Sequence, residues 1–188
     1  FGDFASLASH LRARGEELVA ATNAGIFEPG QVPTGVHVER GRVLQPLNLA
    51  EGAGNFFLKP NGVFFLDGSG PHLVESSRFP LARGVREATQ SGPLLLDEGR
   101  LHRGVSPKST HRKVRNAVGV TATGEVLLIV SREDVTFFQI AKALQARGCR
   151  SALYLDGVIS GLFAPQLPDA LPGRGSFAGI LAVTRPAR

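Results

Sequence analysis

The stretch "SALYLDGVISGLF", residues 151–163, sets one acidic residue between an apolar run and a glycine-bearing turn. The run from Ala152 to Leu155 predicts a short buried strand, because it is continuously apolar and is bounded by turn residues. Asp156 then stands where the chain leaves the sheet. A carboxylate at that position either closes a local Asx turn before Gly157 or is partly desolvated and tuned for acid–base chemistry.

The composition indicates one domain. With 188 residues and 19.9 kDa, the chain can bury roughly 70 per cent of the surface that its unfolded form exposes. We therefore expect a single domain over residues 1–188, preceded in the natural protein by a further segment, because the sequence begins at Phe1 and has no methionine. The single cysteine, Cys149, excludes an internal disulfide. No run approaches the roughly 20 apolar residues that a membrane-spanning helix needs.

The charge favours an anionic partner. The formal net charge is +5, and much of the excess lies in one stretch, which contains Arg100, His102, Arg103, Lys108, His111, Arg112, Lys113 and Arg115. This stretch is either a solvated loop or a surface for a phosphate-bearing small substrate. A nucleic-acid surface is disfavoured, because the stretch lacks interleaved aromatic residues and matches no nucleic-acid-binding motif.

Two stretches have the apolar spacing of an amphipathic helix. The first lies behind an Asp3 cap and ends at Gly15, with its stripe at positions 4, 7, 8 and 11. The second lies behind a capping box of Thr136 and Gln139 and ends at Gly148, with its stripe at positions 137, 140, 141 and 144. Few other segments favour a helix.

The same two stretches suggest an internal repeat. A shift of 133 positions places "LVAATNAGI" (18–26) over "SALYLDGVI" (151–159), and so Asn23 over Asp156. The general pattern of helix, turn and strand explains such a match equally well. If the repeat is real, parallel placement of the two strands brings the polar residues together. We therefore hypothesise that Asn23 and Asp156 share one pocket.

Glycine-rich turns separate segments of β-forming residues. Hairpins are predicted over 36–44 around Arg40-Gly41, over 55–66 around 59–62, and over 118–130 around 122–124. Together these patterns predict the α/β (α+β) class: a single domain with a twisted, mixed, largely antiparallel sheet, a parallel element where the two repeat units meet, and few flanking helices.

Further polar corners accompany Asp156. Gln90 and Ser91 precede Gly92-Pro93, which suits a site residue or an ordinary turn. Arg115 and Asn116 precede an apolar strand, where Arg115 suits either a phosphate contact or a surface salt bridge. Other catalytic patterns fail, since "GVISG" (157–161) displaces the serine of a nucleophile elbow and no histidine or cysteine spacing suits zinc.

Five segments in order carry a resemblance: "TNAGIF" (22–27), "GNFFLKPNGVFFL" (54–66), "QSGPLLL" (90–96), "RNAVGV" (115–120) and "YLDGVISGLF" (154–163). The series resembles the phosphodiester glycosidase family, closest to its bacterial branch of exported proteins. The resemblance covers nearly the whole chain, from about Phe4 to Val183. One departure concerns the last segment, where the best-known member of the family continues Asp-Gly-Gly with small hydroxyl residues and this chain has Val158 after Gly157.

The resemblance implies hydrolysis of the bond between a sugar's anomeric carbon and a phosphodiester oxygen. The expected catalytic residues are Asp156, as nucleophile or base, and Glu28 as a second carboxylate, with Asp67 and Asp134 as alternatives. Arg115 would hold the phosphate. The other expected substrate-binding residues are Asn23, Gln90, Ser91 and Asn116.

The resemblance also sets the expected partners. It implies a small-molecule or glycan substrate that carries a phosphodiester, in a periplasmic or secreted protein. We also expect no nucleic-acid partner, no metal site and no cofactor, with a divalent cation left open. One rival is a non-catalytic module that binds phosphorylated glycans of the cell envelope. A basic protein associated with nucleic acid is the other, which the charge alone permits.

Overall fold

The computed structural model describes residues 1–80, 84–167, 171 and 175–187. The described residues form two α-helices, three short 3-10 helices and fifteen strands. The elements in chain order are α1 (Phe4–Ala13), β1 (Glu16–Asn23), β2 (Phe27–Glu28), β3 (Val32–Pro33), β4 (His37–Glu39), β5 (Arg42–Gln45), η1 (Asn55–Phe57), β6 (Gly62–Asp67), β7 (Gly70–Glu75), η2 (Ser76–Arg78), β8 (Glu87–Ser91), β9 (Leu94–Asp97), β10 (Arg100–Leu101), β11 (Asn116–Thr121), β12 (Val126–Val130), α2 (Phe137–Gln145), β13 (Cys149–Tyr154), η3 (Gly157–Ile159), β14 (Leu162–Phe163) and β15 (Ile180–Pro186).

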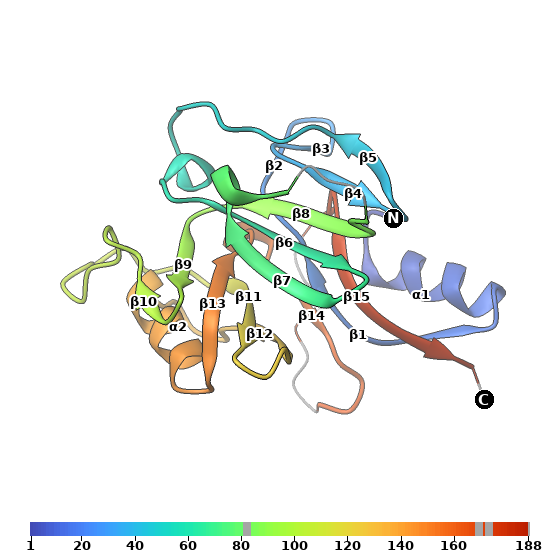
Figure 1. The fold of residues 1–188 in the computed structure, drawn as a ribbon. Coiled ribbons are helices and arrows are strands. Elements are labelled where there is room, and N and C mark those ends of the chain that lie inside the picture. Colours follow the sequence, from blue (N-terminus) through green and yellow to red (C-terminus); the bar gives the residue numbers. More distant parts are fainter. Residues whose placement is uncertain (81–83, 168–170, 172–174, 188) are drawn as a thin grey trace.

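Two five-stranded sheets form the centre of the molecule (Figure 1). One has the order β5-β4-β8-β6-β7 and the other β10-β9-β13-β11-β12, while β14-β1-β15 forms a smaller third sheet and β2-β3 a short hairpin. Chain segments that are remote in sequence therefore meet within each sheet. β13, for example, lies between β9 and β11.

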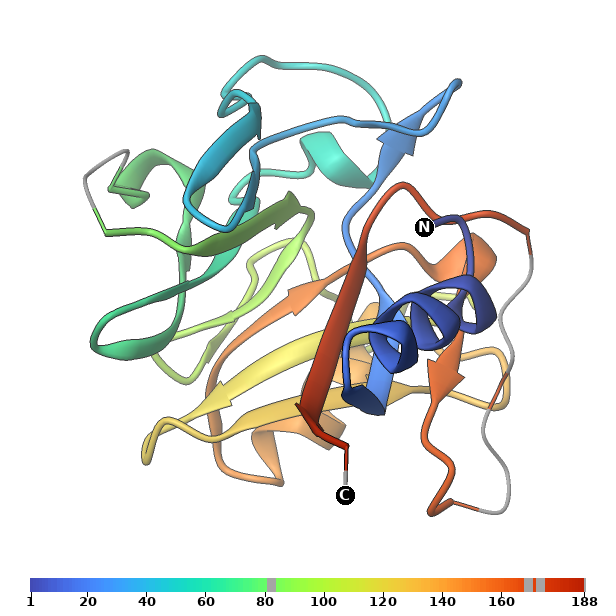
Figure 2. The same cartoon turned by 90° about the vertical axis from the view of Figure 1, so that its right-hand side faces the viewer.

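The apolar core lies between and behind these sheets. One cluster joins the two five-stranded sheets and contains Phe64, Leu73, Leu94, Val118, Val120, Leu153 and Leu155. A second cluster lies under α2, and a third under α1 on the β14-β1-β15 sheet. Figure 2 shows α1 in front of part of β1, against which it packs. β13, which ends at Tyr154, therefore packs on both faces: Ala152 and Tyr154 belong to the cluster under α2, and Leu153 belongs to the cluster between the two large sheets.

The caps and stripes read from the sequence form as expected. Asp3 caps α1 by accepting from the Ser6 backbone N–H at 2.7 Å. Thr136 and Gln139 make the reciprocal capping box of α2, with bonds of 3.2 and 2.9 Å. The helix predictions are therefore confirmed, and so is the hairpin around Arg40-Gly41, whose positive φ values of 50° and 77° suit a primed turn.

The predicted fold class is confirmed, with two corrections of detail. Every strand pair among the described residues is antiparallel, and β1 and β13 lie in different sheets, so the predicted parallel element was wrong. The predicted hairpin over 55–66 was also wrong. Residues 55–57 form η1, and β6 instead pairs with β7 across the turn at 68–69, because Gly68 and Ser69 provide a tighter turn than 59–62.

Candidate active site

Asn116 is the centre of a buried polar network at the start of β11. Its side-chain Nδ2 lies 2.9 Å from the Asn23 carbonyl oxygen, 3.0 Å from Asn23 Oδ1 and 3.0 Å from Thr22 Oγ1. Its Oδ1 accepts from the backbone N–H of Asp156 at 3.0 Å. Asn116 is completely buried. One amide therefore joins the end of β1 to the corner that follows β13.

Asn23 completes this connection from the other side. Its Nδ2 donates to the Asp156 carbonyl oxygen at 2.9 Å, and its Oδ1 accepts from the Gly161 N–H at 3.0 Å. The structure thus brings together the two residues that the 133-residue offset placed in register. The contact arises through side-chain hydrogen bonds across two sheets, and parallel strand pairing is not involved.

Ser91, the last residue of β8, holds the same corner from the first large sheet. Its hydroxyl donates to the Leu155 carbonyl oxygen at 2.9 Å, across 64 residues of sequence. The Ile26 N–H lies 3.4 Å from the same hydroxyl. Ser91 therefore lies at the meeting point of three of the five segments that carry the family resemblance.

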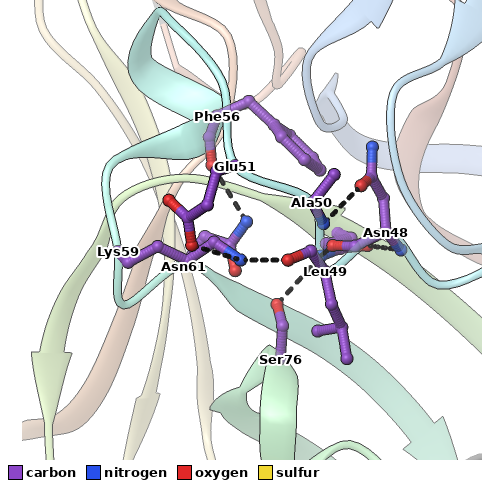
Figure 3. Close-up of polar contacts among 9 residues, drawn as sticks. Asn48, Leu49, Ala50, Glu51, Phe56, Lys59, Asn61 and Ser76 are labelled. Atoms are coloured by element: carbon purple, nitrogen blue, oxygen red, sulfur yellow. Dashed lines mark hydrogen bonds and ion pairs between the residues drawn. The ribbon is translucent and has the colours of Figure 1, made fainter.

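Gln90 occupies a separate network, because adjacent residues of a strand point to opposite faces. Its Oε1 accepts from the Val36 and Asn48 N–H groups at 2.9 and 3.0 Å. Its Nε2 donates to the Asn48 carbonyl at 2.6 Å and to Ser76 Oγ at 3.0 Å. Figure 3 shows Asn48 and Ser76, two members of this separate network. The side-chain amide of Gln90 thus binds the loop at Asn48. The predicted contact of Gln90 with the sugar stays a prediction.

The remaining segment, 54–66, supports the turn after Ser91. Asn61 donates to the Phe56 carbonyl at 2.9 Å (Figure 3), and the Leu94 N–H donates to the Pro60 carbonyl at 2.9 Å. A Cβ on Gly92 would lie 2.5 Å from the Phe56 oxygen, so only glycine permits this close approach. Hydrogen bonds and close packing thus join all five segments.

Arg115 is 4% exposed, and its guanidinium is held within the fold. Nε donates to the Val135 carbonyl at 2.8 Å and Nη2 to the His111 carbonyl at 3.1 Å. The guanidinium carbon lies 3.8 Å from the Phe137 ring centre and 5.5 Å from that of Tyr154. Burial lowers the pKa of Arg115, yet an arginine stays protonated. It places a fixed positive charge behind the corner, and its predicted phosphate contact stays a prediction.

Tyr154 links this charge to the turn. Its hydroxyl accepts from the Gly157 N–H at 2.6 Å, and burial raises the pKa of Tyr154. A Cβ on Gly157 would lie 2.5 Å from this hydroxyl and 2.6 Å from the Val114 carbonyl oxygen. The residue after Asp156 is therefore wedged between β13 and the chain that leads into β11.

Asp156 is the half-buried acidic residue of this corner. Of the three residues considered for a second carboxylate, Glu28 lies on the β2-β3 hairpin and accepts from Thr34 Oγ1 at 3.1 Å. Asp134 is exposed, and its charge opposes the lowering of the pKa of Arg115. It is thus near one predicted site residue. The catalytic roles of Asp156 and Glu28 stay predictions.

Asp67 lies at the other end of the first large sheet. β6 pairs with β8 so that Gly62 faces Ser91 while Leu66 faces Glu87. A cavity of about 270 Å³ adjoins that far end, lined by Leu66, Asp67, Gly70, Pro71, Arg86 and Glu87. Hydrogen bonds from the Ser69 hydroxyl and N–H are the main cause that lowers the pKa of Asp67 to about 2, with a smaller contribution from His72. The cavity is therefore separate from the Asn116 network.

Three network residues were missed from the sequence: Thr22, Tyr154 and Ser160. Thr22 donates to the Gly161 carbonyl at 2.7 Å, and Ser160 Oγ lies 3.4 Å from Asn116 Oδ1. Thr22 directly precedes Asn23, and Tyr154 is the single tyrosine of the chain. Their positions inside the five segments of the family resemblance were a signal, but their partners are too remote in sequence to be inferred.

Two kinds of feature are absent from the described residues. Among them, no three His, Cys, Asp or Glu side chains gather in a way that would hold a metal ion. No helix that they form is long and apolar enough to cross a membrane.

The chain matches known proteins over most of its length. A family model described as phosphodiester glycosidase matches residues 16–168. The uncharacterized protein YigE of Escherichia coli (strain K12) is 32% identical over 164 residues, which are 87% of this chain and 64% of that protein. The chain therefore spans less than two thirds of this relative's length.

Two solved structures share the fold. One is the zebrafish N-acetylglucosamine-1-phosphodiester α-N-acetylglucosaminidase catalytic domain, auto-inhibited by its pro-peptide, with a TM-score of 0.65 and 15% identity over 97% of this chain and 67% of that one. The other is a hypothetical protein from Synechocystis, with a TM-score of 0.56 and 18% identity over 94% of this chain and 54% of that one. At these identities the likeness concerns the fold.

Proposed function

The chain belongs to the phosphodiester glycosidase family, and we propose that it hydrolyses the bond between a sugar's anomeric carbon and a phosphodiester oxygen, with Asp156 as the reacting carboxylate. The observation that carries this proposal is the set of long-range hydrogen bonds at the Asp156 backbone. Its N–H and its carbonyl are held by Asn116 and Asn23, which come from two other sheet ends. A fixed backbone presents its side chain in one place, which catalysis requires.

The leaving group suits a site with one prominent acid. The departing group is a phosphate monoester, which is a weak base, so its departure needs less protonation than that of an alcohol. Asp156 either attacks the anomeric carbon, after which water cleaves the glycosyl ester, or takes a proton from the water that attacks directly. In both routes water adds across the bond, and the products are the free sugar and a phosphate monoester.

The surrounding amides act in this proposal mainly as positioning residues. Asn23 and Asn116 are 1% and 0% exposed, so their amides orient the corner from beneath it. Arg115 contributes a positive charge that lowers the cost of bringing an anion to the corner. Direct contacts of Asn23, Asn116 or Arg115 with the substrate require that the corner open. The proposal also includes substrate contacts of Ser91 and Gln90, which require the same opening.

A second carboxylate decides the stereochemical outcome. About 5 Å between the two carboxyl groups favours retention, and roughly 6.5 to 9.5 Å favours inversion. We propose Glu28 in this role, with Asp134 as the alternative because of its interaction with Arg115. Glu28→Gln and Asp134→Asn separate the two: the variant of the acting residue loses activity at least about tenfold, while the other keeps it.

The direct test is release of free sugar from a glycosyl phosphodiester. N-Acetylglucosamine-1-phosphodiesters are the first probe, because the zebrafish enzyme of the same fold is named for them. The proposal predicts time-dependent release of N-acetylglucosamine or of another sugar from a panel of such diesters. We propose no resident cofactor, so a chelator should leave the rate unchanged.

The second candidate function is a module that binds phosphorylated glycans of the cell envelope without turnover. The departure from the family pattern at Val158 favours it. Calorimetry separates the two candidates, because saturable binding of the diesters with no sugar released after prolonged incubation supports the module. Export to the envelope belongs to both proposals, and fractionation of cells that express the natural protein tests it.

A further inference from the structure

Residues 102–113, between β10 and β11, hold most of the net charge of the chain. We call them the basic loop. It has a formal charge of +4 and no acidic residue, whereas the rest of the chain has a formal charge of +1. Its four cationic side chains are all exposed, and they are Arg103, Lys108, Arg112 and Lys113. A solvated loop needs no such concentration of one sign.

The basic loop is anchored at its base. His102 and Val105 are buried, and Val105 belongs to the core cluster under α2. Within the described part of the chain, none of the four cationic side chains forms an ion pair with an acidic one. Arg112 instead donates to Gln139 Oε1 at 3.0 Å. The loop therefore presents positive charge that no ion pair among the described residues engages.

The loop ends against the candidate active site. The Val114 carbonyl directly after it lies 2.6 Å from the position of a Cβ on Gly157. The Arg115 side chain also donates to the His111 carbonyl within the loop. Figure 1 shows the loop between β10 and β11 extending outward beside α2. A polymeric substrate with one end in the Asp156 corner can thus continue along the loop.

We propose that the basic loop binds the continuation of the substrate, and that this continuation is an anionic glycan with several phosphodiester groups. The inference rests on the proposed function and narrows its substrate class from a single diester to a polymer. One phosphate is satisfied by one or two cationic side chains, so four of them suit several phosphates in succession. The loop contains no Phe, Tyr or Trp for base stacking, which disfavours a nucleic acid.

Local acids set the direction of this path. Lys113 forms a β-bridge with Val135, which places the exposed Glu133 and Asp134 close to that end of the loop. The polymer therefore runs from the corner toward Arg103 and Lys108, away from these carboxylates. Arg103 and Lys108 are the contacts whose loss should weaken binding most.

The test compares two triple variants with the same change in charge. The loop variant is Arg103→Gln, Lys108→Gln and Lys113→Gln, and the control variant is Arg12→Gln, Arg42→Gln and Arg147→Gln, all exposed. Each is made in the Asp156→Asn background so that the polymer stays intact. Calorimetry measures binding of a polymer of N-acetylglucosamine 1-phosphate repeats over a range of salt concentrations.

The loop variant should bind the polymer about tenfold more weakly or worse, and its dependence of log affinity on log salt should flatten by up to about 3. The control variant should match its parent within about twofold. Equal weakening in the two variants would overturn the proposal, and so would a DNA duplex that binds through the loop as tightly as the polymer. These binding results do not depend on turnover. Absence of sugar release from small diesters would contradict the proposed hydrolysis, whereas the binding measurements alone test the basic loop.

Discussion

The tripeptide Leu-Asp-Gly occurs twice in this chain, at residues 66–68 and 155–157, with different surroundings. At Asp67 the carboxylate bonds Ser69 and His72, all within five residues. At Asp156 the backbone bonds Asn116 and Asn23, which lie 40 and 133 residues away. Both carboxylates are half-buried. The same local sequence is thus a hairpin turn in one place and a junction of remote segments in the other.

The cavity and the polar network lie at different ends of the molecule's first large sheet. The cavity of about 270 Å³ lies beside Asp67, and its charged lining comes from residues of adjacent strands. The Asp156 corner has the amides and the buried cation. Long-range bonds cost chain entropy that a simple turn does not require, so a corner that is built from five remote segments indicates selection for a fixed geometry. A cavity at a hairpin needs no such explanation.

The largest expected difference between the two tripeptides is in catalysis. Asp156→Asn should lower kcat toward a glycosyl phosphodiester by at least about 1,000-fold, because it removes the reacting carboxylate. Asp67→Asn should change kcat by less than about twofold. Initial rates of sugar release measure both, and circular dichroism checks that each variant is folded. Full activity of Asp156→Asn would remove this residue from the mechanism.

A second difference concerns stability. Asn116→Ala should lower the free energy of unfolding by about 2–4 kcal/mol, because it leaves several buried polar groups without partners. Ser69→Ala removes the hydroxyl bond to Asp67 and should change the free energy of unfolding by less than about 0.5 kcal/mol, because the site is exposed. Urea unfolding gives both values. Similar losses in the two variants would mean that the Asn116 network is no more structural than the hairpin turn.

The two glycines sharpen the comparison further. Gly157→Ala should destabilise by about 1–3 kcal/mol, since a Cβ there would meet Tyr154 and Val114. Gly68→Ala has open space within 4 Å and should be neutral or slightly stabilising. Thermal unfolding of the two variants measures the difference, and a tolerated Gly157→Ala would show that the corner has room to move.

The smallest effect is the acid dependence of the hairpin. The pKa of Asp67 is lowered from the ordinary value of 3.8 to about 2, so its ionised form stabilises the fold above about pH 4, and this contribution is lost as the pH falls toward 2. Asp67→Asn should therefore lower Tm slightly at pH 6 and leave it nearly unchanged at pH 2. A difference that grows as the pH falls would contradict this assignment.

Much of the fold follows from local sequence. The caps at Asp3 and Thr136 fix both helices, and Arg40-Gly41 fixes one hairpin, because each depends on residues within one turn. The sheet partners of β1 and β13 were not predictable in this way. Their neighbours lie far away in sequence, so the parallel pairing expected from the repeat was wrong even though Asn23 and Asp156 meet.

The meeting of Asn23 and Asp156 was predictable from the sequence, but the contacts of the individual site residues were not. Polar residues at the ends of apolar strands predicted this corner. In the antiparallel pair of β11 and β13, the start of one strand lies beside the end of the other, which brings Asn116 to Asp156. The direction of Gln90 depends on which face of β8 meets the core, and this is set by β4 and β6. The burial of Arg115 depends likewise on Phe137 and Tyr154. Such tertiary contacts have no local signature.

The most direct measurement is a crystal structure of the Asp156→Asn variant with an intact N-acetylglucosamine-1-phosphodiester bound. The anomeric carbon should lie about 3–3.5 Å from the side chain of residue 156, as near attack requires. The phosphate should lie on the side of Arg115 and the basic loop. A diester bound in the cavity beside Asp67, or one that leaves residue 156 untouched, would contradict the assignment of this corner as the active site.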